Sequence, residues 1–192
     1  MPKFRHVLLT GLPGVGKTTL TRKTCDALSA RGVAVNGFYT EEVRVQGRRI
    51  GFDVVSVPGG ERRPLARIPD EGERTRGPMV GQYTVDVASF ESIALPVLTS
   101  HKGNSSVLVV DEVGKMELFS SRFTPALESA LQTCTLLATI PVQRARPIPA
   151  VERLRSRSDV LLVTVQRENR DDPALLENII AVLTSNILSK QL

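Results

Sequence analysis

The stretch Gly11-Leu12-Pro13-Gly14-Val15-Gly16-Lys17-Thr18 decides how the rest of this chain is interpreted. It follows the pattern G-x-x-x-x-G-K-[ST], in which a glycine-rich loop wraps around the phosphates of a nucleotide. Glycines adopt backbone angles that other residues avoid, so successive N–H groups can point inward and form a nest for an anion. A chance match to the four fixed positions is expected in about one chain in a hundred of this length. The motif therefore predicts phosphate binding.

The segments on both sides of the loop fit this interpretation. Residues 5–10 contain the apolar run Val7-Leu8-Leu9, which indicates a buried strand, and residues 17–30 predict a helix with Gly32 just past its end. The N-terminus of such a helix adds partial positive charge beside the phosphates. Lys17 is expected to give a full charge to the β- and γ-phosphates, and the Thr18 hydroxyl to ligate Mg²⁺.

A second motif lies at Asp111-Glu112, directly after the apolar run Val107-Leu108-Val109-Val110. Alone, two carboxylates after a strand are most often a solvated acidic pair. Beside a phosphate loop, the aspartate typically holds Mg²⁺, usually through water, and Mg²⁺ takes only one or two ligands from protein. Glu112 can reach a water in line with the γ-phosphate and act as general base. We therefore predict Asp111 and Thr18 as metal ligands, and Glu112 and Lys17 as catalytic residues.

The remaining pattern alternates between strands and helices. Further buried strands are expected over residues 33–40, 107–110, 136–140 and 160–165. Further helices are expected over residues 89–98 with Ser89 as N-cap, 123–131, 150–157, and from Asp172-Pro173 towards the C-terminus.

Residues 41–87 differ from the rest because apolar and polar side chains alternate there with period two. They predict a hairpin that turns at Val45-Gln46-Gly47, a short strand over 65–68, a polar and mobile loop over 69–78, and a strand over 80–87. The sequence thus predicts a single domain over residues 1–192. Its class is α/β, a P-loop NTPase with a RecA-like three-layer fold and a mostly parallel sheet that carries an inserted antiparallel hairpin section. The order of the strands stays open.

The composition of the chain narrows the classes of molecule that it is expected to bind. The chain has 192 residues and a net charge of +5, which suits an anionic partner, but only 4% of its residues are aromatic and none is Trp. Without a stacking platform, nucleic acid is an unfavoured partner, and a nucleoside triphosphate is the expected one. No apolar run reaches the roughly 18–20 residues of a membrane span, and the N-terminus lacks a secretory signal. We expect a cytoplasmic monomer, with the nucleus also compatible, in which Cys25 and Cys134 serve as small buried apolar residues.

Taken together, these motifs resemble the THEP-type nucleoside-triphosphatases, a family first known from thermophiles whose animal member is called cancer-related nucleoside-triphosphatase. The resemblance is carried by six stretches and one tripeptide: residues 6–19 (HVLLTGLPGVGKTT), 37–55, 80–87, 90–98, 110–119 (VDEVGKMELF), 139–142 and Glu168-Asn169-Arg170. It implies Mg²⁺-dependent hydrolysis of ATP, GTP, CTP, UTP and TTP with low selectivity for the base. The predicted nucleotide-binding set is the loop residues above together with Thr19, Asp111, Glu112, Gly114, Asn169 and Arg170.

Several residues keep two interpretations. Arg44, Arg48 and Arg49 could act as an arginine finger or form a solvated strand edge. Lys115 and Glu117 could line the site or pair with each other, and Asn169-Arg170 could contact the nucleobase or form a helix-entry turn. Two alternative functions also stay open. A nucleoside or nucleotide kinase would use the same scaffold with an acceptor pocket, and a nucleotide-dependent regulatory switch is supported only by the basic charge.

Overall fold

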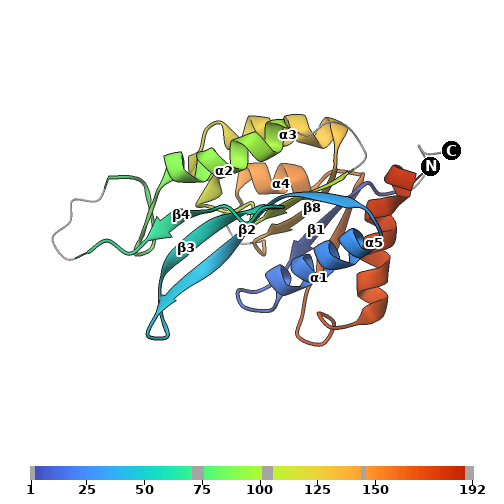
Figure 1. Ribbon diagram of the computed structural model, residues 1–192, viewed down its shortest axis with the longest axis horizontal. Helices are drawn as coiled ribbons and strands as arrows, with labels where there is room; N and C mark the ends of the chain where they lie inside the picture. Colours follow the sequence, from blue (N-terminus) through green and yellow to red (C-terminus); the bar gives the residue numbers. More distant parts are fainter. Residues whose placement is uncertain (1–2, 71–75, 101–105, 144–145, 189–192) are drawn as a thin grey trace.

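The fold is built on one nine-stranded sheet with helices on both faces. The computed structural model describes residues 3–70, 76–100, 106–143 and 146–188, and Figure 1 shows its layers. The strands are β1 (His6–Thr10), β2 (Ala34–Val45), β3 (Arg48–Val57), β4 (Arg62–Arg67), β5 (Met79–Val80), β6 (Tyr83–Val85), β7 (Ser106–Asp111), β8 (Thr135–Ile140) and β9 (Val160–Thr164). The helices are α1 (Lys17–Ala30), α2 (Val87–Thr99), the 3₁₀ turn η1 (Glu117–Phe119), α3 (Phe123–Thr133), α4 (Pro149–Arg155) and α5 (Pro173–Leu188).

The sheet runs in the order β5-β6-β4-β3-β2-β7-β8-β1-β9, and β2, β7, β8, β1 and β9 pair in parallel. Alternate residues of each buried strand face opposite helix layers. Val7 and Leu9 pack with α1 and α5, whereas Leu8 packs on the side of α2, α3 and α4. Strands buried on both faces explain the continuous apolar runs in the sequence. The predicted three-layer α/β architecture is therefore confirmed, and the open strand order is now known.

The inserted section forms the antiparallel half of the sheet, but its first strand is not separate. The predicted strand 33–40 and the first arm of the predicted hairpin are one continuous strand, β2. Residues Ala34–Tyr39 pair in parallel with β7, and Gly37–Val45 pair antiparallel with β3. Tyr39 lies opposite Asp111, so the rest of β2 extends beyond the edge of the sheet where β7 ends. The insertion thus projects past the edge that carries the two sequence motifs.

Two predictions in this section are corrected. The expected strand 80–87 is two short strands, β5 and β6, which are joined by a tight turn so that Val80 pairs with Tyr83. The N-cap of α2 is Asp86, not Ser89, because the Asp86 carboxylate accepts the Ser89 N–H at 2.9 Å and the helix begins at Val87. Of the loop predicted over 69–78, residues 71–75 lie outside the described ranges.

Neither cysteine forms a disulfide: Cys134 is buried and Cys25 is half-buried. Burial raises the pKa of both thiols, that of Cys25 to about 12, so neither is an activated nucleophile. Among the described residues, no helix has the length and apolar character needed to cross a bilayer.

Candidate active site

The phosphate loop joins β1 to α1, as predicted, and two of its glycines are required by their surroundings. Gly16 has φ 112°, an angle that side chains disfavour, and a Cβ there would lie 2.9 Å from Cδ of Arg170. A Cβ on Gly11 would lie 2.5 Å from the carbonyl oxygen of Val165. The loop therefore passes close to the segment that follows β9, with no space for larger residues.

Lys17 lies across this loop. Its Nζ donates to the carbonyl oxygens of Gly11 at 2.9 Å and Leu12 at 3.3 Å. The loop is braced from both neighbouring strands, because the Thr10 hydroxyl donates to the carbonyl of Pro141 at 3.2 Å and the Thr10 carbonyl accepts the Val165 N–H at 2.7 Å. The ammonium group is thus held against carbonyl oxygens of the loop.

Asp111 is buried at the end of β7, with 2% of its surface exposed. Its Oδ1 accepts a hydrogen bond from the Thr139 hydroxyl, and its buried Oδ2 has no hydrogen-bond partner among the described residues. Burial raises the pKa of Asp111, and the side chains of Thr139, Thr18 and Lys17 act against that rise. Thr139 was absent from the sequence-derived set. It reaches Asp111 because β8 lies between β1 and β7, which local sequence does not reveal.

The oxygen atoms around Asp111 fit Mg²⁺. Over the described ranges, no group of three or more His, Cys, Asp or Glu side chains is arranged to hold a metal ion. Mg²⁺ does not need such a group, because it keeps most of its water ligands and takes one or two carboxylate or hydroxyl oxygens from the protein. The unpartnered Oδ2 of Asp111, with the Thr18 hydroxyl close enough to lower its pKa, supplies this kind of ligand.

A cavity of about 550 Å³ opens beside the loop. Lys17 and Glu112 both line it, together with most of the segment that follows β7. Its lining residues are Gly11, Pro13, Lys17, Thr40, Phe52, Leu65, Val80, Glu112, Gly114, Lys115, Met116, Glu117, Pro141, Val142, Gln143, Arg146, Pro147, Ile148, Val151 and Glu152. The two predicted catalytic side chains therefore meet at one cavity.

Glu117 lines this cavity and is 4% exposed. Its Oε2 accepts the Gly114 N–H at 3.0 Å, so the side chain turns back to its own loop and not to Lys115. Burial, followed by the nearby charge of Glu112, raises the pKa of Glu117 to about 8. Of the two interpretations given for Lys115 and Glu117, lining the site is the one that the geometry favours.

Asn169 and Arg170 do not line the cavity. The Asn169 side chain closes its own loop, since Oδ1 accepts the Gln166 N–H at 2.8 Å and Nδ2 donates to the Thr164 carbonyl at 3.0 Å. Arg170 is not part of the phosphate loop but contacts it. Its Nη1 donates a hydrogen bond to the Val15 carbonyl oxygen at 3.3 Å. Both side chains therefore form hydrogen bonds with the backbone. A contact between either of them and a nucleobase stays a prediction.

The hairpin arginines are held by acidic neighbours. Arg44 Nε contacts Glu42 at 3.0 Å, and Arg49 contacts Glu42 at 2.7 Å and the Tyr83 hydroxyl at 2.9 Å. Neither arginine, nor Arg48 at the start of β3, is among the cavity-lining residues. The role of an arginine finger remains untested for all three.

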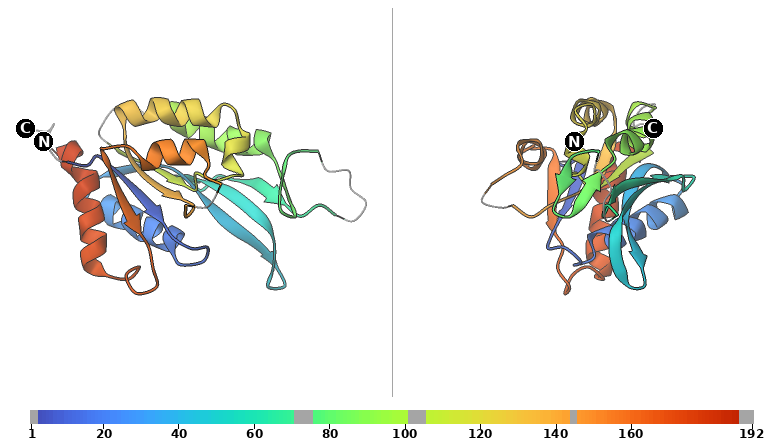
Figure 2. Two further views of the ribbon diagram at one scale, coloured as in Figure 1. Left: turned by 180° about the vertical axis from the view of Figure 1, so that it is seen from behind. Right: turned by 90° about the vertical axis from the view of Figure 1, so that its left-hand side faces the viewer.

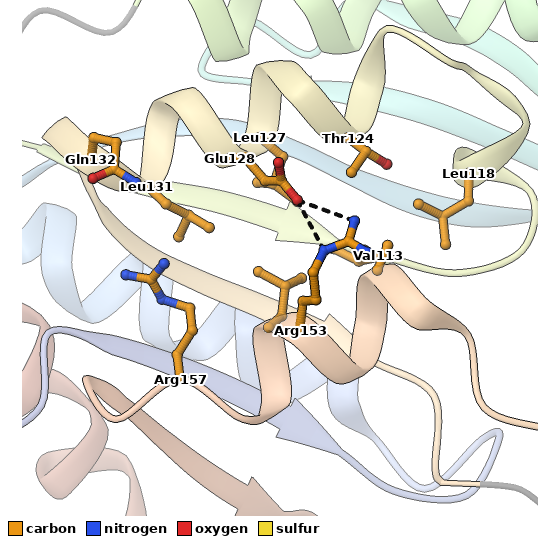
Figure 3. Close-up of a pocket in the computed structure, with 11 residues that line it drawn as sticks. Val113, Leu118, Thr124, Leu127, Glu128, Leu131, Gln132, Arg153 and Arg157 are labelled. Carbon is orange, nitrogen blue, oxygen red and sulfur yellow. Dashed lines mark hydrogen bonds and ion pairs between the residues drawn. The ribbon is translucent and has the colours of Figure 1, made fainter.

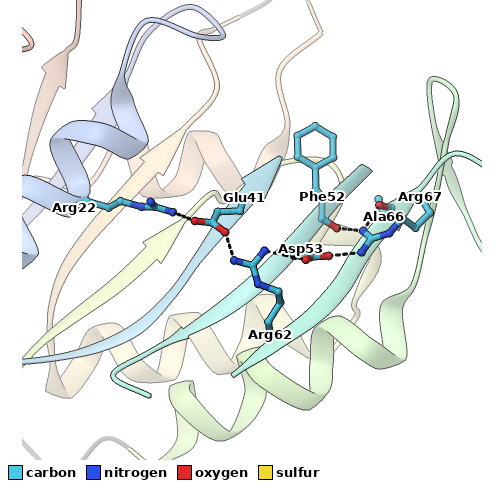
Figure 4. Close-up of polar contacts among 7 residues, drawn as sticks. All are labelled: Arg22, Glu41, Phe52, Asp53, Arg62, Ala66 and Arg67. Carbon is cyan, nitrogen blue, oxygen red and sulfur yellow. Dashed lines mark hydrogen bonds and ion pairs between the residues drawn. The ribbon is translucent and has the colours of Figure 1, made fainter. Parts of the chain in front are cut away.

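A different arginine, Arg22, lies near the site. It is four residues after Thr18 on α1, its guanidinium is 4.2 Å from the centre of the Tyr39 ring, and it pairs with Glu41. Figure 4 shows the contacts continuing across the inserted strands through Arg62, Asp53 and Arg67. The spacing Thr18 to Arg22, one helical turn, is the sequence feature that could have revealed it.

A smaller cavity of about 220 Å³ lies between α3 and α4, away from the phosphate loop (Figure 3). Leucines from both helices form much of its wall, and the Glu128–Arg153 ion pair at 3.2 Å borders it. Lys17 and Glu112 do not line it, and neither does any other residue predicted from the sequence to bind nucleotide.

The whole chain is similar to proteins of one kind. The family model described as NTPase matches residues 6–180. The cancer-related nucleoside-triphosphatase of Homo sapiens is 49% identical over 95% of this chain and 98% of its own length. Nucleoside-triphosphatase THEP1 of Thermofilum pendens is 39% identical over 87% of this chain and 90% of its own.

Two solved structures share the fold. The solution structure of a human cancer-related nucleoside triphosphatase has a TM-score of 0.80, with 49% identity over 94% of this chain and 98% of that chain. The crystal structure of THEP1 from Aquifex aeolicus has a TM-score of 0.78, with 34% identity over 93% and 98% of the two chains. The inserted strands thus lie within the region that these proteins have in common.

Proposed function

The chain belongs to the NTPase family of nucleoside-triphosphatases, and from this membership we propose that it hydrolyses ATP, GTP, CTP, UTP and TTP to diphosphate and inorganic phosphate with Mg²⁺ as cofactor. The observation that carries the proposal is that Lys17 of the phosphate loop and Glu112 after β7 line one cavity, with the Asp111 carboxylate buried at the end of the same strand.

Binding of the triphosphate is assigned to the loop. Its inward N–H groups and the N-terminus of α1 hold the phosphate oxygens, and Lys17 exchanges its contacts with the loop carbonyls for the β- and γ-phosphates. Asp111 and Thr18 would hold Mg²⁺, which when bound neutralises negative charge on the phosphate oxygens.

Hydrolysis is assigned to a water beside Glu112. As the water oxygen bonds to the γ-phosphorus, Glu112 accepts its proton. The bond from the γ-phosphorus to the bridging oxygen breaks, and the diphosphate leaves with the electron pair. Lys17 stabilises the charge that develops on the transferring and leaving groups.

Low base selectivity follows from where the contacts lie. Loop, lysine and carboxylates all act on the phosphate end of the substrate. The Asn169 amide, the side chain predicted nearest to the base, is already hydrogen-bonded at both ends to its own loop. These contacts therefore identify no polar side chain that would recognise one particular base.

The test is phosphate release from NTP without any added acceptor, by the wild type and by Lys17→Ala. Because the hydrogen bonds of Lys17 within the described residues go to loop carbonyls, the variant should keep its thermal stability while kcat/KM falls at least about a hundredfold. Lys23→Ala is a matched control, since Lys23 is on the same helix but pairs with Asp171 outside the loop, and it should be near wild type. Wild-type turnover in Lys17→Ala would refute this assignment of the loop.

A further inference from the structure

The cavity beside Lys17 and Glu112 is larger than hydrolysis requires. It holds about 550 Å³, whereas one water takes roughly 30 Å³ and small-molecule sites span roughly 300–1,000 Å³. The phosphate loop contributes only Gly11, Pro13 and Lys17 to its wall. Asn169 and Arg170, the residues predicted to lie nearest the base, do not line it. Most of the cavity wall therefore comes from residues assigned neither to the phosphates nor to the base of the nucleotide.

The apolar residues of the cavity lining come from two separate regions of the chain. Phe52, Leu65 and Val80 come from three inserted strands, and Phe52 is held by edge contact with the Tyr83 ring, with centres 5.3 Å apart. Met116 and Ile148, half-buried and packed against the core, come from the segments that follow β7 and precede α4. Walls of this kind bind the apolar body of a ring-sized molecule.

The charges around the cavity balance. Once Lys17 is committed to the triphosphate, and because Glu117 keeps its proton at neutral pH, the charged side chains left in the described lining are two acids, Glu112 and Glu152, and two bases, Lys115 and Arg146. The lining therefore does not favour a second phosphate-bearing molecule. An uncharged ligand fits this balance, with its polar group at the end where Glu112 lies.

Resting on the proposed function, we propose that this cavity is an acceptor site for a small uncharged molecule with an apolar body and a hydroxyl group, and that this hydroxyl takes the γ-phosphoryl group in place of water. The hydroxyl oxygen bonds to the γ-phosphorus, its proton passes to Glu112, and the bond to the bridging oxygen breaks. The products are a phosphate monoester and a nucleoside diphosphate, and no other reactant is needed.

The experiment uses benzyl alcohol and 2-phenylethanol at about 50 mM with ATP and Mg²⁺, and follows products by ³¹P NMR. Partition by concentration alone against 55 M water would place only about 0.1% of the phosphoryl groups on the alcohol, whereas a site that holds it should raise this to at least about 10%. With ¹³C-methyl-labelled methionine, the Met116 signal should shift on alcohol binding with a Kd of about 1–10 mM.

Variants that fill the cavity test whether the alcohol binds and reacts there. Val80→Trp should abolish ester formation and the Met116 shift while hydrolysis in water stays within about twofold, and Ile148→Trp repeats the test from the second lining region. Met79→Trp is the matched control, because the adjacent Met79 is 47% exposed and does not line the cavity; it should keep both signals.

The experiments distinguish failure of the acceptor-site proposal from failure of the proposed hydrolysis. Hydrolysis without ester and without a Met116 shift, or ester formation unaffected by both cavity variants, overturns the acceptor site and leaves the nucleoside-triphosphatase assignment standing. Ester formation without hydrolysis supports the acceptor site and overturns hydrolysis as the reaction. Absence of both products overturns both.

Discussion

Asp111 and Glu112 are adjacent in the chain, but their side chains lie in different surroundings. Asp111 is buried and bonded to the Thr139 hydroxyl, whereas Glu112 is half-buried and lines the cavity with Lys17. A buried carboxylate with one unpartnered oxygen suits a cation, and a carboxylate at a cavity wall suits a mobile water. The two acids should therefore respond differently to removal of their charge.

Glu112→Gln should lower kcat by at least about a hundredfold with nearly unchanged nucleotide affinity, because a general base contributes about 10²–10⁴-fold to the rate. Asp111→Asn should weaken nucleotide binding and raise the Mg²⁺ concentration needed for half-maximal rate, as well as slowing the reaction. Phosphate release and Mg²⁺ titrations of both variants measure this. A loss below fivefold in Glu112→Gln would transfer the role to another carboxylate, and Glu117 also lines the cavity.

The raised pKa of Glu117 has a consequence for stability. Its pKa is about 8 in the folded protein against an ordinary value of 4.5, so between these pH values the folded state keeps a proton that the unfolded state has lost. The stabilisation from this proton is complete below pH 4.5 and is lost as pH rises through 8. Glu117→Gln keeps an acceptor for the Gly114 N–H and has no such dependence.

The melting temperature of Glu117→Gln relative to wild type should therefore rise between pH 5 and pH 8, measured without nucleotide or metal. His6, whose pKa burial lowers to about 4, contributes a slope of opposite sign between about pH 4 and 6.5, but it is present in both proteins and cancels. Glu128→Gln, at a half-exposed residue outside the cavity that Glu117 lines, is the control for removing a carboxylate elsewhere. A constant difference for Glu117→Gln would show that this carboxyl ionises normally.

At the scale of elements, α1 and β2 connect the phosphate loop to the insertion. Arg22 of α1 stacks on Tyr39 and pairs with Glu41, both on β2. Tyr39 is the register partner of Asp111, and the charge of Arg22 is one of those that lower the pKa of Asp111. The pair therefore joins the helix that follows the phosphate loop to the strand beside Asp111.

Arg22→Gln and Glu41→Gln should each lower kcat/KM by about three- to tenfold while changing stability by no more than about 1 kcal/mol, because both side chains are partly exposed. If the Arg22–Glu41 contact carries the effect, the double variant should lose little more than either single variant, because each single variant already breaks that contact. Glu177→Gln removes the exposed pair with Arg31, just beyond the other end of the same helix, and serves as control. An equal loss in Glu177→Gln would show that Arg22–Glu41 has no special role.

Helices and strands whose ends are set by neighbouring residues could be predicted from the sequence. The bounds of α1 match the expectation because Gly32, at φ 74°, ends the helix through bonds from its own N–H to Ser29 and from Val33 to Leu28. The continuity of β2 was not predictable, because nothing near Thr40 marks where pairing with β7 ends while pairing with β3 continues. The hydrogen bond from Thr139 to Asp111 depends on β8 lying between distant strands, which is long-range information.

On the scale of the whole molecule, the insertion extends one end of the sheet and α5 lies at the other (Figure 2). Most arginines of the inserted strands are paired with acids: Arg44 and Arg49 with Glu42, Arg62 and Arg67 with Asp53, and Arg63 with Glu61. Residues 41–87 carry as many acidic as basic residues, so the net charge of +5 comes from the rest of the chain. Within the described part of this section, the ion pairs leave no open basic stripe. That nucleic acid is an unfavoured partner stays a prediction.

The arrangement of contacts also predicts how the protein treats different bases. Every charged group assigned to the substrate lies at its phosphate end, so binding energy should be nearly the same for ATP, GTP, CTP, UTP and TTP. We expect kcat/KM for the five substrates to agree within about tenfold at one ionic strength and Mg²⁺ concentration. Sites built to hydrogen-bond one partner reject others by about 10⁴–10⁵-fold, because their buried polar groups are then left unpaired. A preference of a thousandfold for one base would therefore require a base-reading pocket. Asn169→Ala then locates it: loss of the preference would place the pocket at this loop, where Asn169 would have to give up its bonds to Gln166 and Thr164.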